Sequence, residues 1–248
     1  LRTAHQRLMV VRRSTSARRR APRRWLWRAS ALAVLTGFVF LAWFWWDMRA
    51  WRPDETVFPE QGAVIASNAA ATRFATIKAL GGAFAYLELP DENGPPDPGF
   101  AARLAAAREA GLKVGAIHVF DPCRSADAQS AFFTRMVPRD AAWLPPAIAL
   151  VSLADDCAQP VSDAAVESEL VTLINQVETH AGKPVILKLG RAFQARHRSA
   201  QGLERDLWLM RDRAQPDYAG RPWLLWSANA ALVSEASEEP IEWAVVQK

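Results

Sequence analysis

The longest uninterrupted apolar stretch lies near the N-terminus. Residues 29–46 read ASALAVLTGFVFLAWFWW, with no charged side chain. At about 1.5 Å rise per residue, a helix of this length covers roughly 27 Å, close to the hydrocarbon thickness of a bilayer, about 30 Å. Tryptophans, which favour the headgroup layer, mark both borders of the stretch: Trp25, Trp27, Trp43, Trp45 and Trp46. The pattern therefore predicts a transmembrane helix over 29–46.

The charges beside this stretch predict its orientation. Residues 1–28 contain ten arginines and no lysine or acidic residue, whereas Asp47 follows the apolar stretch. The positive-inside rule then places tail 1–28 in the cytoplasm and the folded part on the periplasmic or extracellular side of the cytoplasmic (inner) membrane, in a single-pass arrangement. A cleaved signal peptide and a buried core helix are the alternatives, although bulky rather than small residues follow the apolar run.

Beyond a short polar linker, 47–57, apolar runs alternate with helical patterns throughout 58–248. We expect strands around Val64, at 82–89, 113–120, 146–153 and 184–189, and less distinctly around Trp208, at 222–227 and at 241–246. Helices are expected from the Asp97-Pro98 cap to Gly111, at 126–136 and at 163–180. Buried strands that alternate with helices predict a parallel sheet covered by helices, and about eight strands suit a closed barrel.

The basic balance of the chain belongs to its tail. Without the ten arginines of 1–28, 20 basic residues face 26 acidic ones, a balance of about −6. A mildly acidic domain argues against a nucleic-acid partner. Four scattered histidines and two cysteines show no ligand spacing, so we expect no metal and no cofactor. Cys123 and Cys157 both fall in the exported part and predict a disulfide, with two buried thiols as the alternative.

Seven short segments of the domain carry a resemblance to a known family. In order they are Phe84–Leu87 (FAYL), Asp97–Phe100 (DPGF), Gly111–His118 (GLKVGAIH), Gln129–Phe133 with Val137-Pro138, Leu144–Pro146 (LPP), Gly182–Ile186 (GKPVI) and Arg221–Trp226 (RPW with a second Trp). Together they resemble glycoside hydrolase family 25, the Chalaropsis-type lysozymes or N-acetylmuramidases. The resemblance implies an irregular TIM-like β/α barrel of the (βα)5(β)3 type and action on the sugar backbone of peptidoglycan.

The same resemblance places the family's catalytic carboxylates on residues that differ here. The first-strand Asp falls on Val64, the Asp-x-Glu pair falls on Ala149 and Val151, and the late-strand Asp falls on Glu242. Cleaving a glycosidic bond requires two carboxyl groups, one of which donates a proton to the leaving oxygen. We therefore expect no intact catalytic set, and we expect Glu242 to lie in an apolar barrel mouth.

Other side chains could take part in chemistry or binding, because loops after barrel strands form the active-site face. The possible substitute acids are Glu88, Glu92 and Glu242. The glycan-binding candidates are His118, Trp226 and Asp91. For His118 and Trp226, packing in the core is the alternative interpretation.

Three functional hypotheses follow. The first is a membrane-anchored, catalytically inactive domain that binds peptidoglycan glycan strands or an envelope protein. The second is an active muramidase that uses displaced carboxylates. The third is a structural envelope interaction module whose barrel mouth has filled in.

Overall fold

The computed structural model describes residues 21–69, 71–91 and 99–247, and only the backbone of 21–24. The chain divides into two units between Met48 and Arg49. The first unit contains α1 (Ala21–Arg49) up to Met48, and Trp25–Arg49 is long and apolar enough to cross a membrane. Its large apolar side chains are exposed from Trp25 to Trp46, as in a helix that faces the lipid of a bilayer. The predicted apolar helix is therefore present and extends beyond 29–46 at both ends.

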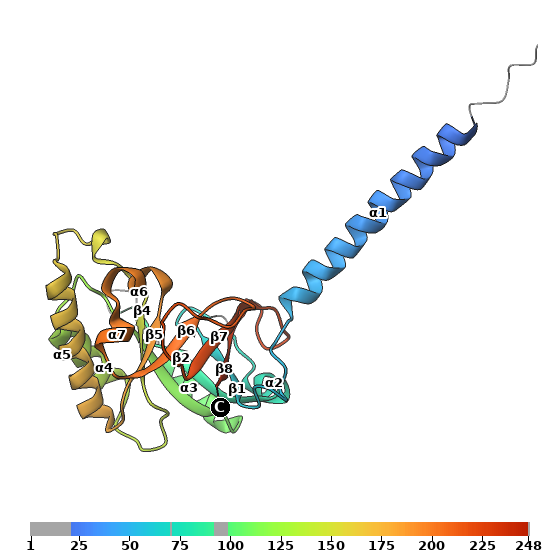
Figure 1. Ribbon diagram of the computed structural model, residues 1–248. Coiled ribbons are helices and arrows are strands. Elements are labelled where there is room, and N and C mark those ends of the chain that lie inside the picture. The colour runs from blue at the N-terminus through green and yellow to red at the C-terminus, as the bar shows by residue number, and fades with distance from the viewer. Residues whose placement is uncertain (1–20, 70, 92–98, 248) are drawn as a thin grey trace, which may run out of the picture. The chain divides into compact units, whose positions relative to one another are not determined.

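The second unit is a closed eight-stranded barrel in which neighbouring strands follow chain order (Figure 1). The strands β1 to β7 run parallel, whereas β8 is antiparallel to both β7 and β1. Their bounds are β1 Gln61–Ile65, β2 Gly82–Glu88, β3 Lys113–Val119, β4 Ala147–Leu150, β5 Ile186–Leu189, β6 Asp206–Met210, β7 Leu225–Leu232 and β8 Ile241–Val246. All eight predicted strands are present.

Helices follow each of the first five strands, and none separates the last three. They are α2 Phe74–Ala79, α3 Gly99–Glu109, α4 Ala126–Met136, the short 3-10 turn η1 Ala154–Asp156, α5 Asp163–Ala181, α6 Arg191–His197 and α7 Ser199–Gly202. This order confirms the (βα)5(β)3 expectation. The helices α2, α6 and α7 were not predicted, and the Asp97-Pro98 cap lies outside the described residues.

Local signals fixed the best-predicted helices. Ser125 and Ser162 each accept a hydrogen bond from a backbone N–H of the first turn, at the start of α4 and α5. Gly182 ends α5 in a left-handed conformation, with φ of 66°. The predicted apolar stripe of α5 is buried against the barrel: Val166, Leu170, Leu173, Ile174 and Val177.

Side chains fill the barrel interior, because alternate residues of every strand point inward. They form a cluster of their own, separate from the larger core between strands and helices: Val64, Phe84, Tyr86, Ile117, Ala147, Ala149, Ile186, Trp208, Leu225 and Ala244. Gly115 makes room for the ring of Tyr86, since a Cβ there would lie 2.2 Å from Tyr86 Cε1. The domain is therefore a packed core with its open surface at the rim.

The expected linker is bound to the barrel from Arg49 onwards. Asn229 Nδ2 donates to the carbonyl of Trp51 at 2.8 Å, and the Val233 N–H donates to the carbonyl of Arg49. Gln61 Nε2 donates to the carbonyl of Pro53 at 3.0 Å. The segment was predicted only as a short polar linker, because its own sequence does not show the polar groups on β1 and β7 that bind it.

Candidate functional site

The carboxyl ends of the strands form the edge at which β/α barrels place their sites. The four residues on which the family resemblance places catalytic carboxylates, Val64, Ala149, Val151 and Glu242, all lie at this edge. Val64 on β1 and Ala149 on β4 are buried in the barrel interior, and Val151, just beyond β4, is 43% exposed. Val64 stands opposite Glu242 in the pairing of β1 with β8. The mouth is thus lined by hydrocarbon at three positions and by a carboxylate at the fourth.

Glu242 is held in an ion pair inside this mouth. Lys188 Nζ on β5 lies 2.8 Å from Glu242 Oε2, and the two side chains are only 8% and 21% exposed. Ser227 Oγ donates to the other carboxylate oxygen, and Trp208 Nε1 donates to Ser227 Oγ at 2.8 Å. The expectation of an apolar surrounding for Glu242 was therefore wrong, since β5, β6 and β7 each supply a polar or aromatic partner.

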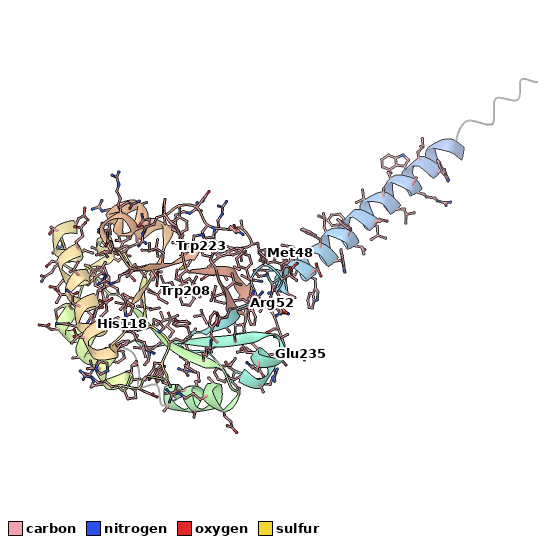
Figure 2. All side chains as sticks on the ribbon, turned by 60° about the horizontal axis from the view of Figure 1, so that its bottom comes forward. Met48, Arg52, His118, Trp208, Trp223 and Glu235 are labelled. Carbon is pink, nitrogen blue, oxygen red and sulfur yellow. A yellow bond between two sulfur atoms is a disulfide. The ribbon has the colours of Figure 1, made fainter. Side chains whose placement is uncertain are left out.

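The indole of Trp208 forms the floor of this network. It is fully buried at the centre of the barrel domain, and Lys188 Nζ lies 4.9 Å from its ring centroid (Figure 2). Tyr86 packs against the same indole in an edge-to-face contact, with ring centroids 4.9 Å apart. The ammonium is therefore held by one carboxylate and one aromatic face, which compensate the cost of its burial.

Glu88, at the end of β2, lies near the same ion pair. Burial raises the pKa of its carboxyl, and the charge of Glu242 acts in the same direction. The charge of Lys188 and a hydrogen bond from the Ser67 backbone N–H oppose this shift without cancelling it. The carboxyl of Glu88 therefore keeps its proton to a higher pH than that of an ordinary glutamate.

A cavity of about 350 Å³ opens beside Glu88, above the ends of β2, β3 and β4. Polar side chains on its wall are Glu88, Asp91, His118, Asp121, Arg124 and Gln129, and Ser67 and Ser152 complete the rim. The structure thus brings together three sequence-predicted residues, Glu88, Asp91 and His118. Glu92 lies outside the described residues.

His118 is buried between β3 and α4. Its Nε2 lies 3.2 Å from Gln129 Oε1, and the ring packs near Phe132 and Phe133. Gln129 also binds both backbone groups of Asp121, which fixes the loop after β3. His118 therefore contributes to the cavity wall through a ring that the helix holds in place.

The predicted disulfide is confirmed between Cys123 and Cys157. It connects the loop after β3, which lines the cavity through Asp121 and Arg124, with the β4–α5 connection, which lines it through Ser152. The bond therefore crosses the site edge of the barrel and restrains two of its loops.

Trp226 does not lie at this site. It is 3% exposed and belongs to the outer core, where its ring packs against Phe58 and Trp223. Its Nε1 donates to the carbonyl of Arg211 at 2.7 Å. This burial fits the packing interpretation of Trp226.

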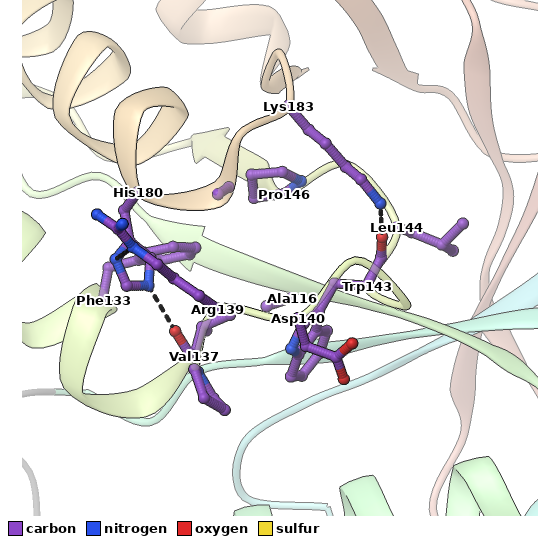
Figure 3. Close-up of a pocket in the computed structure, with 12 residues that line it drawn as sticks. Ala116, Phe133, Val137, Arg139, Asp140, Trp143, Leu144, Pro146, His180 and Lys183 are labelled. Atoms are coloured by element: carbon purple, nitrogen blue, oxygen red, sulfur yellow. Dashed lines mark hydrogen bonds between the residues drawn. The ribbon is translucent and has the colours of Figure 1, made fainter.

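A second hollow, of about 20 Å³, lies at the opposite edge, before β4 (Figure 3). Lys183 Nζ donates to the carbonyl of Trp143, and His180 Nε2 bonds the carbonyl of Val137 at 2.8 Å. These contacts join the end of α5 to the α4–β4 loop. The hollow has room for about one water molecule, so we assign its residues a structural role at the contact between α5 and the α4–β4 loop.

Sequence reasoning did not identify the partners of Glu242. The family resemblance implies a tyrosine at the position of Lys188 and a glutamine at the position of Ser227, so both residues depart from the motifs. Side chains that point inward from different strands meet inside a barrel. Lys188, Ser227 and Glu242 could therefore have been predicted to contact one another. Within the described residues, no three His, Cys, Asp or Glu side chains gather to hold a metal ion.

Known structures with similar folds agree with this architecture. A family 25 glycosyl hydrolase from Bacillus anthracis is 22% identical, with a TM-score of 0.71 over 80% of this chain and 93% of that one. A lysozyme from Streptomyces coelicolor is 16% identical, with a TM-score of 0.65 over 76% and 92%. A muramidase from Trichobolus zukalii is 17% identical, with a TM-score of 0.63 over 76% and 94%. No curated protein matches the chain.

The family model for glycosyl hydrolases family 25 matches residues 65–230, which is more than half of the chain. The match covers the barrel from the end of β1 to β7, including the cavity and Lys188. Motifs, strand order and family model agree, and the chain belongs to glycosyl hydrolases family 25.

Proposed function

We propose that the barrel domain binds the glycan of peptidoglycan without hydrolysing it. One observation carries the proposal: the mouth holds Val64, Ala149 and Val151 at three positions where the family resemblance places carboxylates, and its remaining carboxylate is paired with Lys188. Hydrocarbon side chains exchange no protons, and losing one acid–base group typically removes about 10²–10⁴ of rate. Glu242, bound to Lys188 and Ser227, has both carboxylate oxygens occupied.

The open cavity supports a role in ligand binding over the filled-mouth alternative. Its volume of about 350 Å³ lies within the usual range for small ligand sites, and its wall mixes hydrogen-bond donors with acceptors. Sugars are bound through such groups on a fixed wall. The disulfide and the Gln129 hydrogen bonds hold two loops of this wall in place, so little ordering cost remains when a ligand binds.

Co-sedimentation of the full chain, in detergent, with purified insoluble peptidoglycan tests this proposal. Ser152→Trp would place an indole in the cavity and is expected to weaken binding at least about tenfold. Ser168→Trp, on an exposed position of α5, is the matched control and should bind like the wild type. Equal binding by all three proteins would remove the cavity from the proposal. Recovery of an envelope protein without glycan binding would favour a protein partner.

Glu88 supports a second candidate, an active muramidase that uses displaced acids. Its raised pKa and its position on the cavity wall suit a proton donor. Such an enzyme would release reducing ends from peptidoglycan, and Glu88→Gln would abolish the release. Glu242 is a poor second carboxylate, since Lys188 and Ser227 bind it. Asp121, on the same wall, already accepts a hydrogen bond from the Cys123 backbone N–H. We therefore favour the non-hydrolytic function.

We further propose that α1 anchors the domain as a single-pass helix in the cytoplasmic membrane, with the barrel outside. The helix is long and apolar enough, and the ten arginines of 1–28 precede its uncharged stretch, 29–46. Cell-surface protease digestion of spheroplasts tests the arrangement. Digestion of the barrel in intact spheroplasts supports it, and protection until the membrane is lysed contradicts it.

A further inference from the structure

Two arginines near the site edge have no polar partner in the protein. They are Arg191 and Arg198, both exposed, whose guanidinium groups make no hydrogen bond or ion pair within the described residues (21–69, 71–91 and 99–247). Others nearby are satisfied, as Arg196 is by Asp163. A guanidinium offers five N–H donors, so each of these two groups can bind an oxyanion.

Both unpaired arginines line one cavity, of about 250 Å³, together with Gln194, Gln201 and Tyr218. Gln194 Nε2 donates to Gln201 Oε1 at 2.9 Å, and this pair is fixed in turn by the backbone of α7 and of the β6–β7 loop. The floor of the cavity is therefore rigid and electrically neutral. Its charge comes from the two arginines alone.

The two guanidinium groups are restrained in different ways. Arg191 lies over the ring of Tyr218, with Cζ 5.4 Å from the centroid. Arg198 joins α6 to α7 with φ of 49°, a left-handed conformation that costs free energy for any residue with a Cβ. Glycine or asparagine would satisfy that backbone more easily, so an arginine there is consistent with a use for its side chain.

Tyr218 places this cavity at the same edge of the barrel as the candidate site. Its hydroxyl donates to the carbonyl of Leu189 at 2.6 Å and accepts from the N–H of Met210 at 2.9 Å. These two residues end β5 and β6. A chain that lies across the barrel mouth from β2 to β6 can therefore reach both cavities.

We propose that Arg191 and Arg198 bind carboxylates of the peptides that peptidoglycan carries on its glycan. The inference rests on the proposed function, because the peptides reach this cavity as attachments of the bound glycan. Arginine binds carboxylates in a bidentate geometry, and each charge-assisted contact contributes enough for about a tenfold effect on affinity. The cavity with Arg191 and Arg198 then binds the peptide while the cavity beside Glu88 binds the sugar.

The test compares Arg191→Gln/Arg198→Asn with Arg196→Gln in the full chain in detergent. Asn suits the left-handed position, and Arg196 is a matched arginine of the same helix whose charge is already paired. Peptidoglycan with intact peptides and the same glycan stripped of peptides by an amidase are the two ligands. We expect the double variant to bind peptide-bearing glycan at least about tenfold more weakly and peptide-free glycan unchanged, with the control unaffected.

Titration with the released tetrapeptide separates this inference from the proposed function. If no protein sediments with either glycan, the proposed function fails. Saturable tetrapeptide binding that the double variant loses would still support the arginine site. Equal binding of the double variant to peptide-bearing glycan, or an equal loss on both glycans, overturns the inference. Tighter binding of inorganic phosphate than of the tetrapeptide would also overturn it, because the site would then select phosphate.

Discussion

Lys188→Met removes the cation of the barrel ion pair and keeps the length of the side chain. Breaking a fully buried pair by removing one partner costs about 3–5 kcal/mol. Glu242 is 21% exposed and keeps its hydrogen bond from Ser227, so water and the hydroxyl compensate part of the loss. We expect the free energy of unfolding to fall by about 2–4 kcal/mol, which lowers the melting temperature of a domain this size by roughly 4–16 °C.

Thermal unfolding followed by circular dichroism measures this change, and a double variant isolates its cause. Lys188→Met/Glu242→Leu should recover most of the lost stability, because no unpaired charge remains. Lys113→Met is the matched control: Lys113 also lies 2.9 Å from a carboxylate, that of Glu60, but both side chains are exposed and the change should be small. A Lys188→Met protein as stable as the wild type, or a double variant less stable than either single one, would refute the reasoning.

Three further perturbations follow from the same structure. The pKa of Glu88 is raised in the folded state, so its contribution to stability is full below the ordinary pKa and is lost as pH rises through the folded pKa. Glu88→Gln should remove this loss of stability from melting curves recorded between pH 4 and 7, and an unchanged pH profile contradicts the prediction. Burial acts to raise the pKa of Glu178, but hydrogen bonds from Arg205 and the Val185 N–H hold the pKa below its ordinary value, so stability is lost as pH falls through the lowered pKa. Glu178→Gln should reduce this loss of stability at acid pH and should cost about 1–2 kcal/mol in urea unfolding at pH 7. An unchanged loss of stability at acid pH contradicts the prediction. Replacing both Cys123 and Cys157 by serine removes a disulfide that joins residues 34 positions apart and should lower the free energy of unfolding in urea by roughly 3–4 kcal/mol. A loss below about 1 kcal/mol would argue that the disulfide does not restrain the loop after β3 and the β4–α5 connection.

The periodic and capped parts of the fold could be predicted from the sequence. The helix 126–136 and the strand 241–246 have their predicted bounds because a serine cap and a buried strand pattern are local signals. The short helices α2, α6 and α7 carry too few turns for an apolar period to show. Arg198 even starts α7 in a conformation that its residue type disfavours.

The site was only partly predictable, because its chemistry depends on contacts between distant residues. Lys188 and Glu242 are 54 positions apart and meet only once the barrel closes. In the sequence, Lys188 and Glu242 each stand at a position where the family resemblance implies another residue, and nothing there shows that the two are partners. By contrast, Cys123 and Cys157 were predictable as a pair, since a chain with two cysteines offers one pairing.

Product analysis of purified peptidoglycan incubated with the full chain tests the central claim most directly. Reducing ends are counted in the reaction while the bound protein is measured in the pellet, with an active muramidase as the positive control. The account predicts protein in the pellet and no reducing ends above the blank. Reducing ends released by the wild type, and lost with Glu88→Gln, would contradict it.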